Sequence, residues 1–583
     1  MLVDTACLPG QSRVPRKCGT SLNSPSSLSV RPKNKVNYSR VGPSSAAVFL
    51  RQPTKAYLNV SQQKPITELL AELESQTELA LNRVYKIDSE TPLDSMPLDN
   101  GCLLHLKRED TSKVHSYKWR GAYNKIANLL ESGFSGPIVA ASAGNHAQGV
   151  AIAAFGNQLK ATIFMPLSTP LVKQEAAQAF GGSFVEIRLV GDSFDESSTA
   201  AKAFAAETGG TLIPPYDDLL VIAGQSTIGV EILKVLQQKP THAFLPIGGG
   251  GMAAGVASVL KRLSPDTKII GVEAVDQNSM GVSIAGGQRQ TVSLLDRFCD
   301  GTAVAIPGEL PFQICQELVD EFTTVTNAEV CDAIQELWQR KRIIVEPSAA
   351  LGVAAAFKHD LKPDDRPTTI LSGSNVDFLM LPKIARRGQL NRPERRYVGF
   401  KLGEKPGELA GLLQRFGNEI NIIDFQYGKV SESVAYPIIG IEVAKQKIGE
   451  LDALLASPDL ADHFNVTGAA VIDFRVIPFN IELFHYPYFA VIQFSNRPGA
   501  LREFMHEAGQ QANVCYMNYT DDGQTEGFAL MGFEFTDIGK QSQFIDWLVK
   551  TTEFQPVPMD QVKHLNLKNM NVDRFESLSP DEQ

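Results

Sequence analysis

The chain has 583 residues, 43% of them hydrophobic and 21% charged, a balance that is ordinary for a folded globular protein of several domains. Its net charge of −10 argues against a general nucleic-acid-binding surface, and no apolar run is long enough to span a membrane. Seven scattered cysteines, without closely spaced pairs, favour neither a disulfide framework nor a metal site.

The first 55 residues differ in composition from the rest of the chain. They contain nine Lys or Arg, nine Ser and a single acidic residue, Asp4. Such a segment cannot bury enough apolar surface to fold alone, and at an N-terminus it is typical of an organellar transit peptide. Because it shows no basic amphipathic helix, it favours the plastid (chloroplast) stroma. A disordered extension in a cytoplasmic protein is the alternative.

Residues 56–388 alternate helical stretches with short apolar runs. A helix is expected at Pro65–Arg83, where leucines recur on one face and glutamates on the other. The alternation predicts an α/β domain with a mostly parallel sheet, and uninterrupted apolar strands fit burial on both faces. The predicted strands include Ile138–Ala140, Thr162–Met165, Ser183–Ile187, Ala243–Ile247, Lys268–Val272 and Thr368–Leu371.

Lys118 lies in the stretch His-Ser-Tyr-Lys-Trp-Arg-Gly-Ala, just before a helical pattern. A free lysine amine has a pKa of about 10.4 and becomes a useful nucleophile or base only when desolvated or held as a Schiff base. A lysine at the start of a helix suits such a position. Taken alone, the pattern is more typical of a surface lysine on an amphipathic helix.

Two loops follow predicted strands and precede helical patterns. In the first, Ser-Ala-Gly-Asn-His at 142–146, exposed backbone N–H groups at a helix start would hold an anion such as a carboxylate. In the second, the glycines 248–251 let the backbone approach a phosphate. The second loop also fits a dinucleotide site, with Glu273 at the end of the next strand as its ribose contact. Ordinary strand-to-helix turns remain the alternative for both.

A polar turn, Ser-Gly-Ser-Asn at 372–375, follows the last predicted strand. The carboxyl ends of strands are where open α/β sheets place ligands. A charged linker with Pro and Gly is expected at 389–396.

Residues 397–480 and 481–583 form an internal repeat. Lys405-Pro-Gly-Glu-Leu, Asn421 and Tyr427 have counterparts 92 positions later, at Arg497-Pro-Gly-Ala-Leu, Asn513 and Tyr519. Each copy reads as strand, Pro-Gly turn, amphipathic helix and strand, which predicts two small α+β modules. A duplicated scaffold used only for oligomer contacts is the simplest alternative to a regulatory role.

The order of the lysine motif, the Ser-Ala-Gly-Asn-His loop, the four glycines and the Ser-Gly-Ser-Asn turn resembles the pyridoxal-phosphate enzymes of the tryptophan-synthase-β fold type, fold type II, and among them the threonine dehydratases. The similarity covers roughly residues 80–583. It implies a two-lobed α/β catalytic domain followed by an α+β regulatory domain of two ACT-like repeats.

The resemblance also implies residue roles. Lys118 would hold pyridoxal 5′-phosphate as a Schiff base, Asn145 would hydrogen-bond the 3′-oxygen of its ring, and Ser372 would meet the pyridine nitrogen. The main chain of Gly248, Gly249, Gly250, Gly251 and Met252 would cradle the phosphate. The substrate carboxylate would be bound by Ser142, Ala143, Gly144 and Asn145. The effector residues are not located by this resemblance.

The implied activity is β-elimination of L-threonine to 2-oxobutanoate and ammonia, inhibited by isoleucine at the C-terminal domain of a homotetramer. Serine/threonine dehydratase, serine racemase and threonine synthase are alternatives within the same fold. A non-catalytic amino-acid sensor and a nicotinamide-dependent dehydrogenase are alternatives from other classes.

Overall fold

The computed structural model describes residues 64–294, 296–390, 394–417, 420–460, 463–467, 477–495, 497, 499–521, 526–559 and 562. The expected transit peptide, residues 1–55, lies outside them. Within these ranges no helix is both long and apolar enough to cross a bilayer. In the same ranges, no three His, Cys, Asp or Glu side chains gather as metal ligands.

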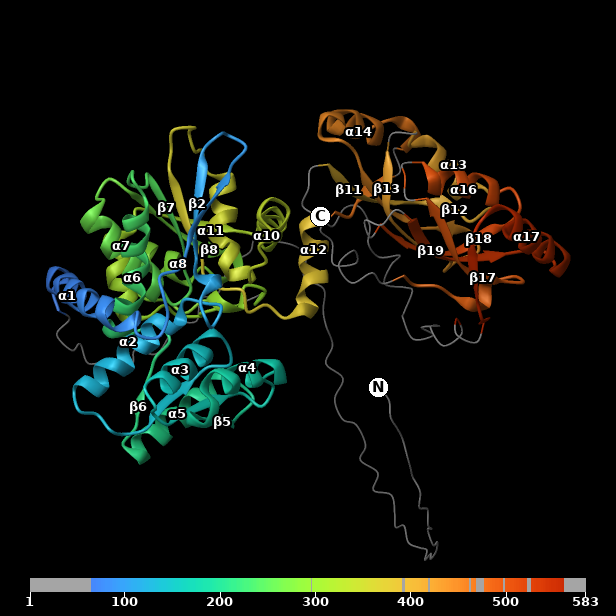
Figure 1. Cartoon of the computed structure of the whole chain (residues 1–583). Helices are drawn as coiled ribbons and strands as arrows, with labels where there is room; N and C mark the ends of the chain where they lie inside the picture. The colour runs from blue at the N-terminus through green and yellow to red at the C-terminus, as the bar shows by residue number, and fades with distance from the viewer. Residues whose placement is uncertain are drawn as a thin grey trace, which may run out of the picture. The chain divides into compact units, whose positions relative to one another are not determined.

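The α/β domain has two lobes, and a six-stranded sheet forms the centre of the larger one (Figure 1). Its strands run in the order β1-β2-β10-β7-β8-β9, parallel except for β1, which is antiparallel to β2. Their bounds are β1 Leu93–Pro97, β2 Leu103–Arg108, β7 His242–Pro246, β8 Lys268–Ala274, β9 Glu321–Val325 and β10 Pro367–Leu371.

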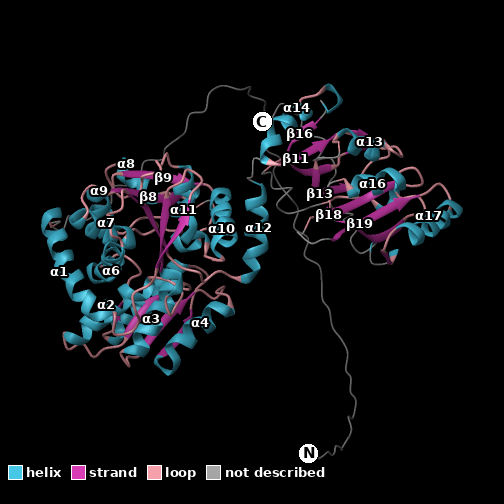
Figure 2. Cartoon of the chain, turned by 45° about the horizontal axis from the view of Figure 1, so that its top comes forward, coloured by secondary structure: helices cyan, strands magenta, loops and turns pink. Residues whose placement is uncertain are grey.

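Helices cover both faces of this sheet, as the alternating pattern of the sequence predicts (Figure 2). One face packs against α1 Ile66–Val84, α6 Leu219–Val235, α7 Gly251–Leu263 and α9 Glu309–Leu318. The other packs against α10 Asn327–Lys341, α11 Pro347–Lys358 and α12 Leu381–Leu390. The short helix α8 is Ser279–Ala285. Both apolar layers are closed, so the strand ends become the accessible positions on the sheet.

A second, four-stranded sheet forms the smaller lobe, in the fully parallel order β5-β4-β3-β6. One face packs on α2 Lys118–Glu131, α3 Asn145–Gly156 and α4 Leu171–Gly181, and the other on α5 Phe194–Thr208. The strands are β3 Ile138–Ala141, β4 Ala161–Met165, β5 Val185–Leu189 and β6 Thr211–Leu212. The two-lobed, mostly parallel α/β prediction is therefore confirmed.

Most predicted elements lie within two residues of the observed ones. The helix expected at Pro65–Arg83 is α1, and five of the six predicted strands coincide with β3, β4, β7, β8 and β10. The strand expected at Ser183–Ile187 starts two residues later. Gly182 has a φ of 52° and opens a 3₁₀ turn over Gly182–Phe184, and this turn delays the strand.

The C-terminal part repeats one order of elements twice: strand, helix, two strands, helix, strand. The first copy is β11 Arg395–Phe400, α13 Glu408–Arg415, β13 Asn421–Gly428, β15 Ile438–Glu442, α14 Ile448–Leu455 and β16 His463–Asn465. The second is β17 Tyr488–Ser495, α16 Ala500–Ala508, β18 Asn513–Thr520, β19 Glu526–Glu534, α17 Ile538–Thr551 and β20 Phe554–Val557. A two-stranded pair, β12 Leu402–Gly403 and β14 Val434–Ala435, completes the first copy.

Both copies share one eight-stranded sheet, in the order β16-β11-β15-β13-β18-β19-β17-β20. The order reads the same from either end once each strand is replaced by its repeat counterpart. At its centre β13 pairs antiparallel with β18, and Gln426 lies opposite Asn518, its own counterpart 92 positions on. One apolar core contains residues of both copies. The predicted duplication is confirmed as a single α+β unit.

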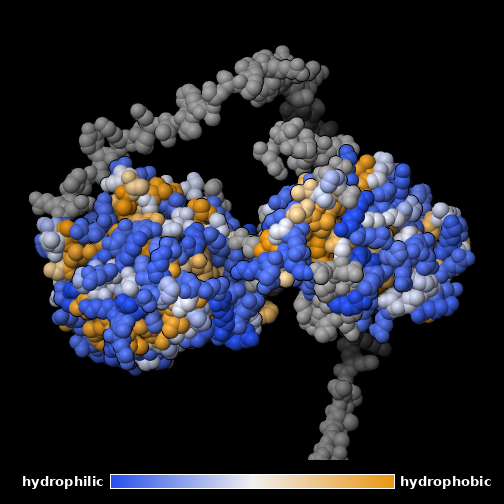
Figure 3. All heavy atoms as spheres, turned by 90° about the horizontal axis from the view of Figure 1, so that it is seen from above, coloured by the Kyte–Doolittle hydropathy of each residue, from blue (hydrophilic) through white to orange (hydrophobic). Residues whose placement is uncertain are grey.

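The segment expected as a linker, 389–396, is partly occupied by regular structure. Helix α12 continues to Leu390 and β11 begins at Arg395, while 391–393 lie outside the described residues. The face seen in Figure 3 is mostly hydrophilic, with apolar residues in separate patches, as is usual for a folded protein surface.

Candidate functional site

Lys118 is the first residue of α2. Its side chain is half-buried, and its Nζ donates a hydrogen bond to the Pro215 carbonyl oxygen at 3.0 Å. The rings of Tyr117 and Tyr216 lie 5.2 and 6.0 Å from Nζ. Among the described residues, no carboxylate lies within ion-pair distance of Nζ. The amine is thus held by a neutral acceptor and aromatic faces, which leaves it available to a ligand.

Close backbone contacts fix the start of α2. A Cβ at Gly149 of α3 would lie 2.9 Å from the Lys118 carbonyl carbon, and a Cβ at Gly224 of α6 would lie 2.5 Å from the Arg120 carbonyl oxygen. Neither contact could relax by a side-chain rotation, because the atoms met belong to backbone. Glycines at these crossings therefore let three helices converge on Lys118.

A buried network of charged side chains holds α2 in place. Arg120 Nε lies 2.8 Å from Glu109 Oε2, and Arg120 Nη1 lies 2.5 Å from Glu231 Oε1. Lys107 Nζ lies 2.5 Å from Glu231 Oε2, and all four side chains are at most 1% exposed. Burial raises the pKa of Glu231, but the charges of Arg120 and Lys107 outweigh it and lower that pKa. Two cations and two carboxylates balance, which is the condition for burying them.

The turn that carries Ser372 pairs with the chain entering α2. The Tyr117 amide donates to the Ser372 carbonyl oxygen at 3.1 Å, and the Ser374 amide donates to the His115 carbonyl oxygen at 2.9 Å. Ser372 is 5% exposed, and its hydroxyl donates to no described residue. These bonds hold the Ser372 turn against the residues just before Lys118, and a nearly buried hydroxyl in this turn suits a ring nitrogen.

Asn145 begins α3 and joins two of the predicted motifs. Its Oδ1 accepts a 2.8 Å hydrogen bond from Asn375 Nδ2, whose orientation is fixed by a second bond to the Val114 carbonyl oxygen at 2.9 Å. The Nδ2 of Asn145 therefore faces Glu346, with distances of 2.8 and 3.0 Å to its two carboxylate oxygens. One amide hydrogen remains for a ligand oxygen.

Glu346 is a site residue that the sequence analysis missed. It is buried, and burial raises its pKa to about 7, while the Asn145 hydrogen bond lowers it and Asp300 raises it further. A Cβ at Gly373 would lie only 2.9 Å from its Oε1. The one sequence signal is Pro347 at the first position of α11, which marks a helix start and no chemistry.

The glycines 248–251 form a cradle with the backbone donors that an anion needs. Gly248 to Met252 are buried, and α7 starts at Gly251. The backbone amides of this stretch donate no hydrogen bond to another described residue. Side chains would not fit here. A Cβ at Gly249 would lie 2.4 Å from the Tyr216 ring, and one at Gly250, where φ is 92°, would lie 2.4 Å from the Met280 methyl. Orphaned buried N–H groups at a helix start fit a phosphate.

The loop of Ser142, Ala143 and Gly144 lies half-buried at the end of β3, directly before Asn145. The Ser142 hydroxyl accepts from the Gly144 amide at 3.3 Å, and a Cβ built on Gly144 would meet nothing within 4 Å. Open space beside helix-start amides suits a small carboxylate. The neighbouring His146 is buried, and burial and the charge of Lys118 lower its pKa to about 3, so it is neutral at physiological pH.

The dinucleotide interpretation is wrong, because its acidic residue is engaged elsewhere. Glu273 is 1% exposed, and its carboxylate accepts from the amides of Met280 and Gly281 at 2.8 and 2.7 Å. Both oxygens therefore cap the start of α8 and face no ribose. The glycine loop instead adjoins Tyr216, the residue after the Pro215 acceptor of Lys118.

The four motifs, up to 254 residues apart in the chain, are thus linked to Lys118 through at most two intermediate residues. Lys118 reaches the glycine loop through Pro215 and Tyr216, the Ser372 turn through Tyr117, and the Asn145 loop through Gly149. A phosphate cradle, a free hydroxyl, an amide donor and a lysine amine together form a set of groups that fits pyridoxal phosphate.

Comparison with known proteins gives the same assignment. Residues 86–373 match the family described as pyridoxal-phosphate-dependent enzyme. Residues 482–555 match the C-terminal regulatory domain of threonine dehydratase.

Similar proteins cover most of the chain. The chloroplastic biosynthetic threonine dehydratase 1 of Solanum lycopersicum is 33% identical over 468 residues, 79% of this chain and 76% of that protein. The biosynthetic L-threonine dehydratase of Escherichia coli is 32% identical over 479 residues, 78% of this chain and 89% of that protein. The solved structure of processed threonine deaminase isoform 2 from Solanum lycopersicum superposes with a TM-score of 0.52 at 39% identity, covering 55% of this chain and 89% of that one.

Proposed function

The chain belongs to the family of biosynthetic threonine dehydratases, and from that premise we propose that it converts L-threonine to 2-oxobutanoate and ammonia with Lys118 as its catalytic residue. The cofactor is pyridoxal 5′-phosphate. When bound, it supplies the electron sink that makes the threonine Cα proton acidic.

In this proposal each predicted site residue has one role in binding the cofactor. The amides of Gly248 to Met252 hold the phosphate, the Asn145 amide meets the ring 3′-oxygen, and the Ser372 hydroxyl meets the ring nitrogen. A hydroxyl, unlike a carboxylate, does not keep that nitrogen protonated, and this favours prompt elimination over long-lived carbanion chemistry. Two observations support these roles. The nearly buried Ser372 hydroxyl donates to no described residue, and the buried amides of the glycine loop donate to none either.

In the proposed reaction one loop holds the substrate and Lys118 deprotonates it. The amides of Ser142, Ala143, Gly144 and Asn145 bind the threonine carboxylate at the start of α3. The Lys118 Nζ removes the Cα proton, and the β-hydroxyl takes up a proton and leaves as water. The enamine product tautomerises to an imine, which takes up water and releases ammonia and 2-oxobutanoate. In the structure Lys118 Nζ is held by the neutral Pro215 carbonyl oxygen, so no ion pair among the described residues has to break before the amine reaches a substrate.

The position of the Lys118 amine among the four motifs carries the proposal, and its removal tests it. Lys118→Ala should lose the visible absorption of the bound cofactor together with the release of 2-oxobutanoate from threonine. Lys113→Ala is the matched control, because Lys113 lies on the same loop with an exposed side chain that bonds only the Ile87 carbonyl. A Lys118→Ala protein that keeps most of its turnover would refute the assignment.

Assays with other substrates separate the rivals of the same fold. Racemisation of L-serine to D-serine, or turnover of phosphohomoserine, would replace the threonine assignment with serine racemase or threonine synthase. A colourless purified protein would favour the non-catalytic sensor.

Isoleucine is the proposed effector, and the C-terminal unit is its proposed binding region. The match of residues 482–555 to a regulatory domain of threonine dehydratase supports this. The proposed assembly is a homotetramer, which light scattering of the purified protein would test.

Residues 1–55 are the proposed plastid transit peptide. Two plant relatives, from Solanum lycopersicum and Arabidopsis thaliana, are named as chloroplastic, which supports this address. A fusion of residues 1–63 to a fluorescent protein should enter plastids, and a diffuse cytoplasmic signal would reject it.

A further inference from the structure

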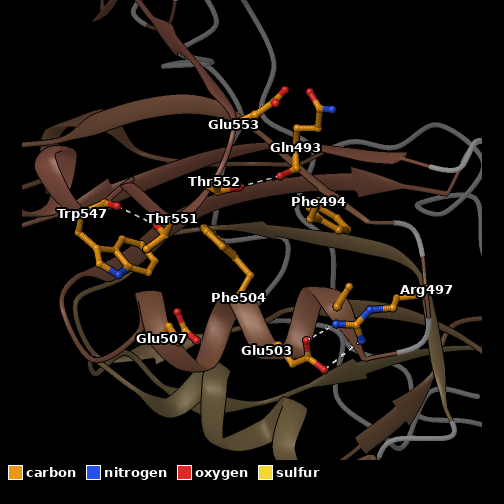
Figure 4. Close-up of a pocket in the computed structure, with 11 residues that line it drawn as sticks. Gln493, Phe494, Arg497, Glu503, Phe504, Glu507, Trp547, Thr551, Thr552 and Glu553 are labelled. Atoms are coloured by element: carbon orange, nitrogen blue, oxygen red, sulfur yellow. Dashed lines mark hydrogen bonds and ion pairs between the residues drawn. The ribbon is translucent and has the colours of Figure 1, made fainter. Parts of the chain in front are cut away.

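Glu346 lacks the surroundings that a carboxylate usually has. It is 5% exposed, and among the described residues no cationic side chain lies within ion-pair distance of it. Glu503, which lines a cavity of about 530 Å³ in the second repeat, shows the usual case: it pairs with Arg497, and both side chains are more than half exposed to water (Figure 4). Burying a carboxylate away from both a cation and water is costly, so packing alone does not explain Glu346.

The backbone of Glu346 is bonded to the turn that carries Ser372. The Glu346 amide donates to the Gly373 carbonyl oxygen at 3.1 Å, and the Glu346 carbonyl oxygen accepts from the Ala349 amide at 2.9 Å as α11 begins. These two backbone bonds set the position of the residue between β10 and α11. They do not involve its side chain, so a substitution of the side chain leaves them in place.

Backbone on two sides confines the Glu346 carboxylate. A Cβ at Gly373 would lie 2.9 Å from its Oε1, and a Cβ at Gly301 would lie 3.3 Å from the same oxygen. Both glycines therefore lie directly against the carboxylate, which leaves it little freedom to turn away from its hydrogen-bond partner.

That partner is Asn145 of α3. Its Nδ2 donates to the Glu346 carboxylate, with distances of 2.8 and 3.0 Å to the two oxygens, while its Oδ1 accepts from Asn375. An acceptor on one side of the Asn145 amide and a donor on the other determine which way round the amide stands. One Nδ2 hydrogen remains for the ring 3′-oxygen that the proposed function assigns to Asn145.

We propose that Glu346 is a positioning residue that holds the Asn145 amide for the 3′-oxygen of the cofactor ring. It acts through Asn145 and makes no contact with the cofactor itself. Because its backbone also bonds the Ser372 turn, one residue of the larger lobe joins the two groups that meet the ring, at its 3′-oxygen and at its nitrogen. The inference rests on the proposed function, since it takes the ring contacts of Asn145 and Ser372 from there.

Equilibrium dialysis of the full-length protein, loaded with pyridoxal 5′-phosphate or with 3-deoxypyridoxal 5′-phosphate, tests this role. The analogue lacks the 3′-oxygen, so it cannot accept the Asn145 hydrogen bond. The unmodified protein should hold the natural cofactor about tenfold more tightly than the analogue, as expected for one buried hydrogen bond.

Variants of Glu346 should change this tenfold preference and nothing else in cofactor binding. Glu346→Met keeps a side chain of similar shape without an acceptor, so it should lose most of the preference by weakening the natural cofactor alone. Glu346→Gln keeps one acceptor oxygen and should retain part of it. Asn145→Ala should abolish the preference, and adding Glu346→Met to it should change nothing further. Glu317→Gln, at an exposed position, is the control that keeps the full preference.

Thermal unfolding separates positioning from structural support. With the analogue bound at pH 8, Glu346→Met should unfold at or above the temperature of the unmodified protein, because it removes a buried carboxylate that has no cation. A lower unfolding temperature, together with equal weakening of the natural cofactor and the analogue, would identify Glu346 as structural support and overturn the inference.

The same measurements distinguish failure of this inference from failure of the proposed function. If Asn145→Ala abolishes the preference and Glu346→Met keeps it, Glu346 does not position Asn145 and the proposed ring contact stands. If the unmodified protein does not prefer the natural cofactor, the proposed Asn145 contact is wrong and the inference is refuted with it. Threonine turnover of the unmodified protein tests the proposed activity independently of either result.

Discussion

Glu346 is a buried carboxylate with no cation in hydrogen-bonding contact, and its ionisation links the site to pH. Its pKa is raised to about 7 by burial, against about 4.3 for a free glutamate. The folded protein therefore holds this proton more tightly than the unfolded chain does. The stability that the protonated group contributes is fully present below about pH 4.3 and is lost as the pH rises towards 7.

We expect Glu346→Gln to remove this part of the pH dependence. The difference in unfolding free energy between pH 5 and pH 8 should shrink by about 3 kcal/mol, because a glutamine does not titrate. Urea unfolding at several pH values measures it, with the exposed Glu317→Gln as the control that keeps the original slope. Glu273, with a pKa also raised to about 7 by burial, leaves a residual slope of the same sign. An unchanged slope in Glu346→Gln would contradict the prediction.

Most residues of the site lie in short sequence motifs, and Glu346 does not. Lys118, Asn145, the glycines and Ser372 sit in short motifs at strand ends or helix starts, where their chemistry is readable from neighbours in the chain. Glu346 meets Asn145 across 201 residues of sequence. Only the packing of the two lobes brings them together, so no local pattern could predict that contact.

At the scale of elements, helix crossings set the position of Lys118. Gly149→Ala would place a Cβ 2.9 Å from the backbone of Lys118 and Trp119, which would push α3 away from α2. We expect a loss of about 1–3 kcal/mol in unfolding free energy, as for overpacked sites. Turnover should fall by about 10–100-fold, because both Lys118 and Asn145 are displaced.

Thermal unfolding and threonine turnover of the variant measure the two effects. Gly411→Ala in α13 is the control of opposite sign, since a Cβ there would meet nothing within 4 Å. It should stabilise its helix by about 0.5–1 kcal/mol. A Gly149→Ala protein as stable and active as the parent would show that the two helices have room to adjust.

Elements with a clear apolar pattern are predictable from the sequence, and short strands of mixed composition are not. The buried strands β3, β4, β7 and β10 follow directly from their sequences. The hairpin of β1 and β2 was missed because β1 reads Leu-Asp-Ser-Met-Pro, which has a charge, a proline and little β propensity. Its place in the sheet is determined by its pairing with β2, a tertiary contact that overrides local preference.

At the scale of the whole molecule, the described strands of the catalytic unit and those of the regulatory unit form separate sheets. Every described strand between Leu93 and Leu371 pairs within that range, and the described strands from Arg395 to Val557 pair only with one another. Deleting residues 397–583 should therefore leave threonine turnover measurable and abolish inhibition by isoleucine. The lost coupling would be about 1–3 kcal/mol in free energy. Dose–response curves of the two proteins test this, and inhibition that survives the deletion would place the effector elsewhere.

The central pairing of β13 with β18 bears on the origin of the C-terminal unit. Gln426 lies opposite its own counterpart, Asn518, so the register is the one that two identical copies would adopt around a twofold axis. An ancestral half, standing alone, would have carried an unpaired edge strand able to associate with a twin through the same ladder. Joining two such halves in one polypeptide would leave each half free to change separately. Leu412 of α13 and Leu455 of α14 stand where the second copy has Phe504 and Trp547.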